Sequence, residues 1–374
     1  MRVSRNIFIK LTLLGAVLLA VLYCLQISNG YYWKYSNAHK QNAVANENHS
    51  ATLDLINKNN NNNNNKTYVN KFINSLDNSM TNNYNVWCIF TKVTTNSPMK
   101  RKFRIFTESL LKYSSVDIYF NVITDNDSRV IAEEIINNII LVFKKSIQVQ
   151  YYDVHKLASQ LEDIVSVMSP KFSSKPGTYY SDALFFLSLG LHRIASPRQK
   201  LAVMLDVDTK FRRDIKELFR EFDNFGPDAL FGLAPELTPV YRHVLYLYRS
   251  QNPSTQFGEA CSSGGYPGYN SGVVLFNLER LRNSLEYDQI VSMDMVEHIT
   301  AKYSFKGHLG DQDFYTLLGM ERPELIHTVD CGWNRQLCTW WRDRGYAEVF
   351  SNYSQCNSET KLWHGNCNTP IPVH

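Results

Sequence analysis

Residues 201–208 read Leu-Ala-Val-Met-Leu-Asp-Val-Asp, an uninterrupted apolar run followed by an acidic pair. Consecutive apolar residues of this kind are typical of a strand that is buried on both faces, as in the parallel sheets of α/β domains. In such sheets, ligands bind at the carboxyl ends of the strands. The stretch therefore predicts a central strand over Leu201–Leu205 and a functional site at Asp206 and Asp208.

From Val86 to the end of the chain, short apolar runs alternate with stretches of helical spacing. This alternation predicts one α/β domain over 86–374, with a mixed, mostly parallel sheet flanked by helices. Further strands are expected at Val86–Lys92, Val116–Thr124, Gln148–Tyr152, Ala229–Ala234 and Tyr269–Phe276. Helices are expected at Phe103–Tyr113, Ile131–Phe143 and Asp214–Phe222.

Two segments precede this domain. Residues 1–27 begin with basic side chains and continue with an apolar run that is long enough to span a bilayer. We therefore predict a type II signal-anchor helix in the endoplasmic reticulum membrane, or alternatively the Golgi, with the rest of the chain lumenal. A cleaved signal peptide is the competing interpretation. Residues 28–85 are rich in asparagine and poor in aliphatic side chains, which predicts a disordered lumenal stem.

The charged residues and the cysteines narrow the class of protein. The net charge is +4 and the 39 lysines and arginines are scattered, so we predict no nucleic-acid partner. Outside the apolar segment there are six cysteines, and four of them lie in the last 44 residues: Cys331, Cys338, Cys356 and Cys367. Because they form no C-x-x-C pair, we expect disulfides rather than a zinc site, with 15 pairings open. Cys261 is expected to tether the Gly- and Ser-rich loop at 253–266.

The acidic pair suggests a metal site. On an extended backbone Asp206 and Asp208 point to the same side, while Val207 points away. Two carboxylates in one small volume favour a divalent cation with oxygen ligands. The alternative is a turn in which Asp208 caps the following helix.

Three further motifs carry polar groups at positions where strands or helices begin or end. They are Asn270-Ser271-Gly272 at the start of a strand, Gly310-Asp311-Gln312-Asp313 at the start of an apolar helix, and Trp363-His364-Gly365-Asn366 near the chain's end. The glycine of the first motif permits a close backbone approach. The imidazole of His364 is a candidate metal ligand.

Taken together and in this order, L-D-V-D, N-S-G-V, G-D-Q-D and H-G-N resemble the motifs of glycosyltransferase family 8. That family is a retaining group with the GT-A (Rossmann-like) fold, and the resemblance runs from about Val86 to the end. The closing stretch Trp363–Pro372 is most similar to the xyloside alpha-1,3-xylosyltransferase branch. The resemblance implies transfer of xylose from UDP-xylose, in alpha-1,3 linkage, onto xylose-glucose O-glycans on EGF-like repeats of Notch-type proteins.

The resemblance also implies a role for each matching residue. Asp206, Asp208 and His364 would bind Mn²⁺, with Mg²⁺ as the alternative, and Gln312 and Asp311 would face the reacting centre. Residues implied at the donor are Phe90, Thr91, Lys92, Asp125, Asp182, Val207, Asp208, Asn270, Ser271, Gly272 and Gly365. At the acceptor we expect aromatic and amide groups, because sugar rings stack on aromatic faces. The residues expected there are His243, Tyr246, Trp341 and Asn366, together with Gln312.

Several alternatives stay open at this point. The donor sugar could instead be glucose, galactose or glucuronic acid, and a non-catalytic lumenal glycan-binding protein would keep the same fold. Retention could come from reaction on one face of the sugar or from double displacement through Asp311 or Asp313. Asp182 and Asp311 could be helix caps. A homodimer is a further expectation.

Overall fold

The computed structural model describes residues 84–145, 147–174 and 183–372. The predicted anchor, nearly all of the predicted stem and Asp182 lie outside these ranges. Within the described part, no helix combines the length and the apolarity needed to cross a membrane.

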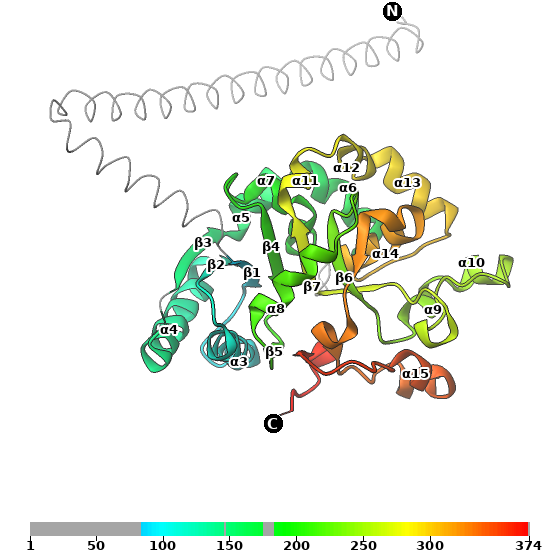
Figure 1. The fold of residues 1–374 in the computed structure, drawn as a ribbon. Helices are drawn as coiled ribbons and strands as arrows, with labels where there is room; N and C mark the ends of the chain where they lie inside the picture. Colours follow the sequence, from blue (N-terminus) through cyan, green and yellow to red (C-terminus); the bar gives the residue numbers. More distant parts are fainter. Residues whose placement is uncertain (1–83, 146, 175–182, 373–374) are drawn as a thin grey trace, which may run out of the picture. The chain divides into compact units, whose positions relative to one another are not determined.

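Seven of the described strands form one mixed sheet in the order β3-β2-β1-β4-β7-β6-β8 (Figure 1). Its strands are β1 (Tyr84–Phe90), β2 (Ile118–Thr124), β3 (Gln148–Asp153), β4 (Leu201–Leu205), β6 (Phe231–Pro235), β7 (Tyr269–Asn277) and β8 (Ile326–Thr328). The first four run parallel to one another, and β7 is antiparallel to both of its neighbours. The prediction of a mixed, mostly parallel sheet flanked by helices is confirmed.

The longer helices cover the two faces of this sheet. The helices are α3 (Pro98–Tyr113), α4 (Asn126–Phe143), α5 (Val154–Gln160), α6 (Glu162–Phe172), α7 (Leu191–Ile194), α8 (Ile215–Phe219), α9 (Val240–Val244), α10 (Tyr246–Gln251), α11 (Leu278–Arg282), α12 (Leu285–Ile290), α13 (Met293–Lys302), α14 (Asp311–Glu321) and α15 (Ala347–Tyr353). Figure 1 shows α3 and α4 together on one side, with α6 and α11–α13 on the other.

The position of β4 in the middle of the sheet explains why its sequence is apolar throughout. Ala202 and Met204 pack in the core cluster that contains α6, α13 and α14. Val203 and Leu205 pack in the other cluster, with α3 and α4. Because successive side chains point to opposite faces and both faces are covered, residues 202–205 are all buried.

The predicted element bounds differ from the structure at a few ends. β1 begins at Tyr84, two residues before the predicted start, because the Tyr84 ring packs edge-on against Phe219 at 4.9 Å. Asn85 Nδ2 also donates to the Leu201 carbonyl at 2.9 Å. The helix predicted at Asp214–Phe222 is shorter: α8 ends at Phe219 and continues as a 3-10 turn at Arg220–Asn224.

A second, three-stranded sheet brings the end of the chain to the middle of the fold. It contains β5 (Thr209–Phe211), β10 (Leu362–His364) and β9 (Arg335–Gln336), with β10 in the centre. In the β5–β10 register, His364 lies opposite Thr209. Disulfides Cys331–Cys356 and Cys338–Cys367 hold the surrounding C-terminal segments.

The expectation that Cys261 tethers its loop is wrong. Among the described cysteines, Cys88 is a buried thiol in β1 and Cys261 is an exposed thiol. The loop is held instead by Glu259, whose carboxylate pairs with Arg242 and Arg249. Ion pairs to α9 and α10 therefore take the place of the expected covalent link.

Candidate functional site

Asp206 and Asp208 were expected to point to the same side because they would lie on an extended strand. They lie in a turn instead. β4 ends at Leu205, and residues 206–208 lead directly into β5. The turn is held by Asp206 N, which donates to the Gly272 carbonyl at 2.9 Å, and by Thr209 Oγ1, which donates to the Asp206 carbonyl at 2.8 Å. The alternative role for Asp208 as a helix cap does not apply, because Asp214 caps α8.

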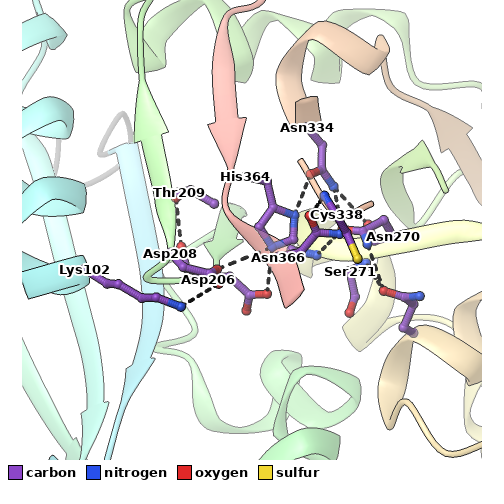
Figure 2. Close-up of polar contacts among 12 residues, drawn as sticks. Lys102, Asp206, Asp208, Thr209, Asn270, Ser271, Asn334, Cys338, His364 and Asn366 are labelled. Carbon is purple, nitrogen blue, oxygen red and sulfur yellow. Dashed lines mark hydrogen bonds and ion pairs between the residues drawn. The ribbon is translucent and has the colours of Figure 1, made fainter. Parts of the chain in front are cut away.

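His364 completes a three-residue cluster with the acidic pair. Its Nε2 lies 3.5 Å from Asp206 Oδ2 and 3.4 Å from Asp208 Oδ1. One ligand atom from each of the three residues falls within 4.8 Å of the others. Figure 2 shows the imidazole between the two aspartates and Asn334. The predicted partnership of a strand-end pair with a distant C-terminal histidine is thus present in the fold.

Asn334 orients the imidazole, and sequence analysis missed this residue. Asn334 Nδ2 donates to Asn270 Oδ1 at 2.9 Å, so its Oδ1 is the atom that faces His364 Nδ1, also at 2.9 Å. An acceptor at that position requires Nδ1 to carry a proton, which leaves Nε2 directed at the carboxylates. The local sequence offered no signal, because Asn334 lies on a different segment of the chain.

The three candidate ligand side chains suit a hard or borderline divalent cation. Two carboxylates and one imidazole are ligands that Mn²⁺ accepts. His364 is buried, whereas the Asp206 side chain is 60% exposed, so one side of the cluster remains open to further ligands. Burial opposes the charged forms of Asp208 and His364, but their mutual hydrogen bond and opposite charges outweigh it. The pKa of Asp208 is consequently lowered and that of His364 raised.

Gly272, Val207 and Gly365 pack around the cluster. A Cβ at position 272 would overlap Cε1 of His364, so only glycine permits this approach of β7 to the ring. Val207 is the middle residue of the turn, and its side chain is buried. Gly365 N donates to the Asp208 carbonyl at 2.8 Å. All three predicted donor residues therefore border the three candidate metal ligands.

The N-S-G and G-D-Q-D motifs meet in space. Asn270 Nδ2 donates to Gln312 Oε1 at 3.1 Å, and Ser271 Oγ donates to Asp311 Oδ1 at 3.0 Å. Ser188 Oγ donates to the other oxygen of Asp311 at 2.5 Å. Burial raises the pKa of Asp311 to about 7 despite these hydrogen bonds. The strand and the helix N-terminus thus form one polar wall.

A buried carboxylate that sequence analysis missed lies behind this wall. Glu236, at the end of β6, accepts from Asn270 Nδ2 at 2.9 Å and from Gln312 Nε2 at 3.3 Å through one oxygen. Tyr241 OH also lies 3.3 Å from Gln312 Nε2. The amide of Gln312 is therefore held with its nitrogen toward Glu236 and its oxygen toward Asn270.

Asp313 has a structural role. It is fully buried, and it accepts from the backbone N–H groups of His308 and Leu309 at 2.6 and 2.7 Å and from Tyr241 OH at 3.0 Å. Burial raises its pKa to about 7. Because its oxygens hold the loop before α14, Asp313 is poorly placed to serve as the nucleophile considered earlier.

The residues predicted at the nucleotide lie at the carboxyl ends of β1 and β2. Phe90 stacks on Phe103 at 4.2 Å between ring centroids in the core, so its side chain faces the core. Asp125 caps α4 by accepting from Ser128 N at 2.8 Å, and it also accepts from Lys92 N at 2.5 Å. Thr91 is half-buried. Asp125 thus links the two strand ends through the backbone of Lys92.

The residues predicted at the acceptor fall into two places. The rings of His243 and Trp341 lie 5.1 Å apart, and His243 Nδ1 is 2.8 Å from the hydroxyl of Tyr346, which sequence analysis missed. Tyr246 is 61% exposed on α10. Asn366, by contrast, turns its Oδ1 to the backbone N–H groups of residues 337 and 338, at 3.0 and 2.9 Å.

Lys102 is a further residue of the site that no motif indicated. It extends from α3, and its Nζ lies 3.4 Å from Asp208 Oδ2 (Figure 2). The same Nζ lies 3.0 Å from Asn368 Oδ1. The cluster therefore contains a lysine as well as the histidine.

Comparisons with known proteins agree with this geometry. No family model matches the chain. The chain is 43% identical to Xyloside xylosyltransferase 1 of Mus musculus over 296 residues, which cover 77% of this chain and 75% of that protein. The crystal structure of the mouse protein in its apo form superposes with a TM-score of 0.74 at 44% identity, covering 78% of this chain and 100% of that one. Xylosyl- and glucuronyltransferase LARGE2 of Mus musculus is 28% identical, covering 67% of this chain and 32% of that protein.

Proposed function

This chain belongs to the xyloside xylosyltransferase family of GT-A-like glycosyltransferases, and we propose that it transfers xylose from UDP-xylose, with retention, to xylose-glucose O-glycans on EGF-like repeats in alpha-1,3 linkage. The observation that carries the proposal is the convergence of Asp206, Asp208 and His364 on one point at the end of β4. Membership of a glycosyltransferase family argues against the non-catalytic alternative.

Mn²⁺ would be held by those three residues, and when bound it would act as a Lewis acid that offsets charge on the departing UDP. The protein's own part is to keep the ligands in place. Asn334 fixes the tautomer of His364, and Gly272 allows its ring to lie against β7. Behind them, Glu236 keeps the Gln312 amide in one orientation, beside Asp311 and Ser271.

An aromatic surface supports a sugar acceptor. His243, Trp341 and Tyr346 contact one another, and the neighbouring Trp340 is 48% exposed. Exposed rings of this kind stack on the apolar C–H faces of sugars. The segment before Trp340 is bonded to Asn366, two residues after His364, so a glycan that stacks on this surface would point toward the proposed metal site.

The proposal includes a lumenal location behind an N-terminal membrane anchor, in the endoplasmic reticulum or Golgi. The two disulfides support it, because disulfides persist in oxidising compartments.

A donor screen tests the function directly. The full-length chain, purified in mild detergent, is incubated with UDP-xylose, UDP-glucose, UDP-galactose or UDP-glucuronic acid, with Mn²⁺ or with EDTA, and UDP release is measured. We expect Mn²⁺-dependent turnover of UDP-xylose, which a xylose-glucose glycopeptide acceptor increases. Preferred turnover of another donor would replace UDP-xylose in the proposal.

The metal ligands are tested in the same assay. Asp208→Asn should abolish turnover, because it removes a ligand charge from the cluster. The exposed Asp223, in the 3-10 turn that follows α8, provides the matched control, and Asp223→Asn should leave turnover unchanged. Undiminished turnover of Asp208→Asn, or full activity in EDTA, would contradict the metal-dependent mechanism.

A further inference from the structure

We propose that Lys102 is a second cation of the donor site: it neutralises the acidic pair before the donor binds, and it pairs with the diphosphate of the nucleotide once a divalent ion occupies the pair. This inference rests on the proposed function, since it takes a nucleoside diphosphate sugar as the ligand. It assigns a role to a side chain that lies outside all four motifs.

The geometry places this amine at the edge of the metal site. Lys102 Nζ contacts Asp208 Oδ2 at 3.4 Å, while His364 Nε2 contacts the other oxygen of Asp208 at 3.4 Å. The Lys102 side chain is 21% exposed and that of Asp208 is 18% exposed. A second contact, to Asn368 Oδ1 at 3.0 Å, keeps the amine beside the C-terminal loop. Lys102 and His364 therefore approach Asp208 through different oxygens (Figure 2).

The charges explain why the lysine would change partner. Without a metal ion, Lys102 offsets part of the negative charge of the two aspartates, through its contact with Asp208. A divalent ion at the pair offsets both carboxylate charges by itself. Lys102 then lies beside a cation with no carboxylate charge left to offset its own, which is unfavourable in a partly buried site. An anion that arrives next to the metal removes this conflict.

The diphosphate of a nucleotide sugar is such an anion. It carries two negative charges, and a third develops when the bond between the anomeric carbon and the phosphate oxygen breaks, because the electron pair stays on that oxygen. A fixed ammonium therefore interacts more strongly with the departing UDP than with the intact donor. Lysine suits this role, because its long flexible stem lets the amine move between the two partners.

The test uses the full-length chain and three variants. Lys102→Met keeps the length of the side chain but removes the charge, and Lys102→Arg keeps the charge. Lys100→Met is the matched control, since Lys100 lies on the same helix but pairs with Glu134 at 3.5 Å. Calorimetry measures Mn²⁺ affinity without nucleotide and UDP affinity in saturating Mn²⁺, and steady-state assays give kcat and KM.

Lys102→Met should change the two affinities in opposite directions. Mn²⁺ should bind about threefold tighter, because a competing cation is gone. UDP should bind on the order of tenfold more weakly, because one charge-assisted contact is lost. Lys102→Arg and Lys100→Met should keep wild-type values for both affinities. The kcat of Lys102→Met should fall more than its KM rises.

Two results would overturn the inference. Weaker binding of both Mn²⁺ and UDP would mean that Lys102 only maintains the shape of the site, and unchanged UDP affinity would mean that the diphosphate does not reach it. If the wild type binds UDP but does not turn over UDP-xylose, the proposed function fails while the opposite changes in affinity still decide the role of Lys102. If the wild type with Mn²⁺ does not bind UDP, both fail.

Discussion

The two disulfides provide a matched pair of perturbations. They join cysteines 25 and 29 residues apart, Cys331–Cys356 and Cys338–Cys367. Loop-closure entropy then contributes about 3.5 and about 3.6 kcal/mol to the free energy of unfolding at 25 °C. Removing either bond should therefore cost almost the same stability.

The two bonds differ in their relation to the metal site. The loop closed by Cys338–Cys367 contains His364, and Asn366 within it binds the backbone of Cys338. The other loop contains no metal-binding candidate, although it includes Asn334, which orients His364. We therefore expect Mn²⁺ affinity to fall on the order of tenfold or more in the double variant Cys338→Ala/Cys367→Ala, because a ligand loses its support. The double variant Cys331→Ala/Cys356→Ala should lose less affinity, because its loop carries Asn334 but none of the three residues that would bind the ion.

Both quantities can be measured on the same preparations. Urea unfolding gives the free energy of unfolding, and titration calorimetry gives the Mn²⁺ affinity of the folded protein. Equal loss of Mn²⁺ affinity in the two double variants would refute the reasoning, because it would mean that global stability rather than the local loop governs the site. Unchanged affinity in both would refute it as well.

Two further predictions concern single residues. Gly272→Ala should weaken Mn²⁺ binding at least about tenfold, because the added Cβ displaces the His364 ring. Gly226→Ala is the control and should leave Mn²⁺ binding unchanged, because its added Cβ meets no atom within 4 Å. Equal Mn²⁺ titrations for the two variants would contradict this prediction. Asp313 has a folded-state pKa raised to about 7, so its contribution to stability is present at low pH and is lost as pH rises through that value. In urea unfolding between pH 5 and 8, the stability of the wild type relative to Asp313→Asn should therefore fall with pH by at most about 1.4 kcal/mol per pH unit, and parallel pH profiles would rule this out.

The local pattern alone determined the main elements of the domain. The apolar run of β4 is buried on both faces, and that requirement is visible in consecutive residues. The expected helices and strands were found because hydrophobic periodicity is a short-range property. The convergence of Asp206, Asp208 and His364 was implied by the resemblance, because each residue belongs to one of its short motifs, but the turn at residues 206–208 was not anticipated.

Only the tertiary structure decided what surrounds those ligands. Lys102 lies 106 residues from Asp208 in sequence and 266 from Asn368, and Asn334 lies 30 residues from His364. The pairing of the cysteines and the position of Glu236 behind Gln312 depend on contacts of the same kind. Such contacts form because helices and strands pack in one particular way, and packing joins residues whose local sequences carry no mark of each other. The sequence therefore determined which residues could bind a metal, while the fold decided which residues orient them and balance their charge.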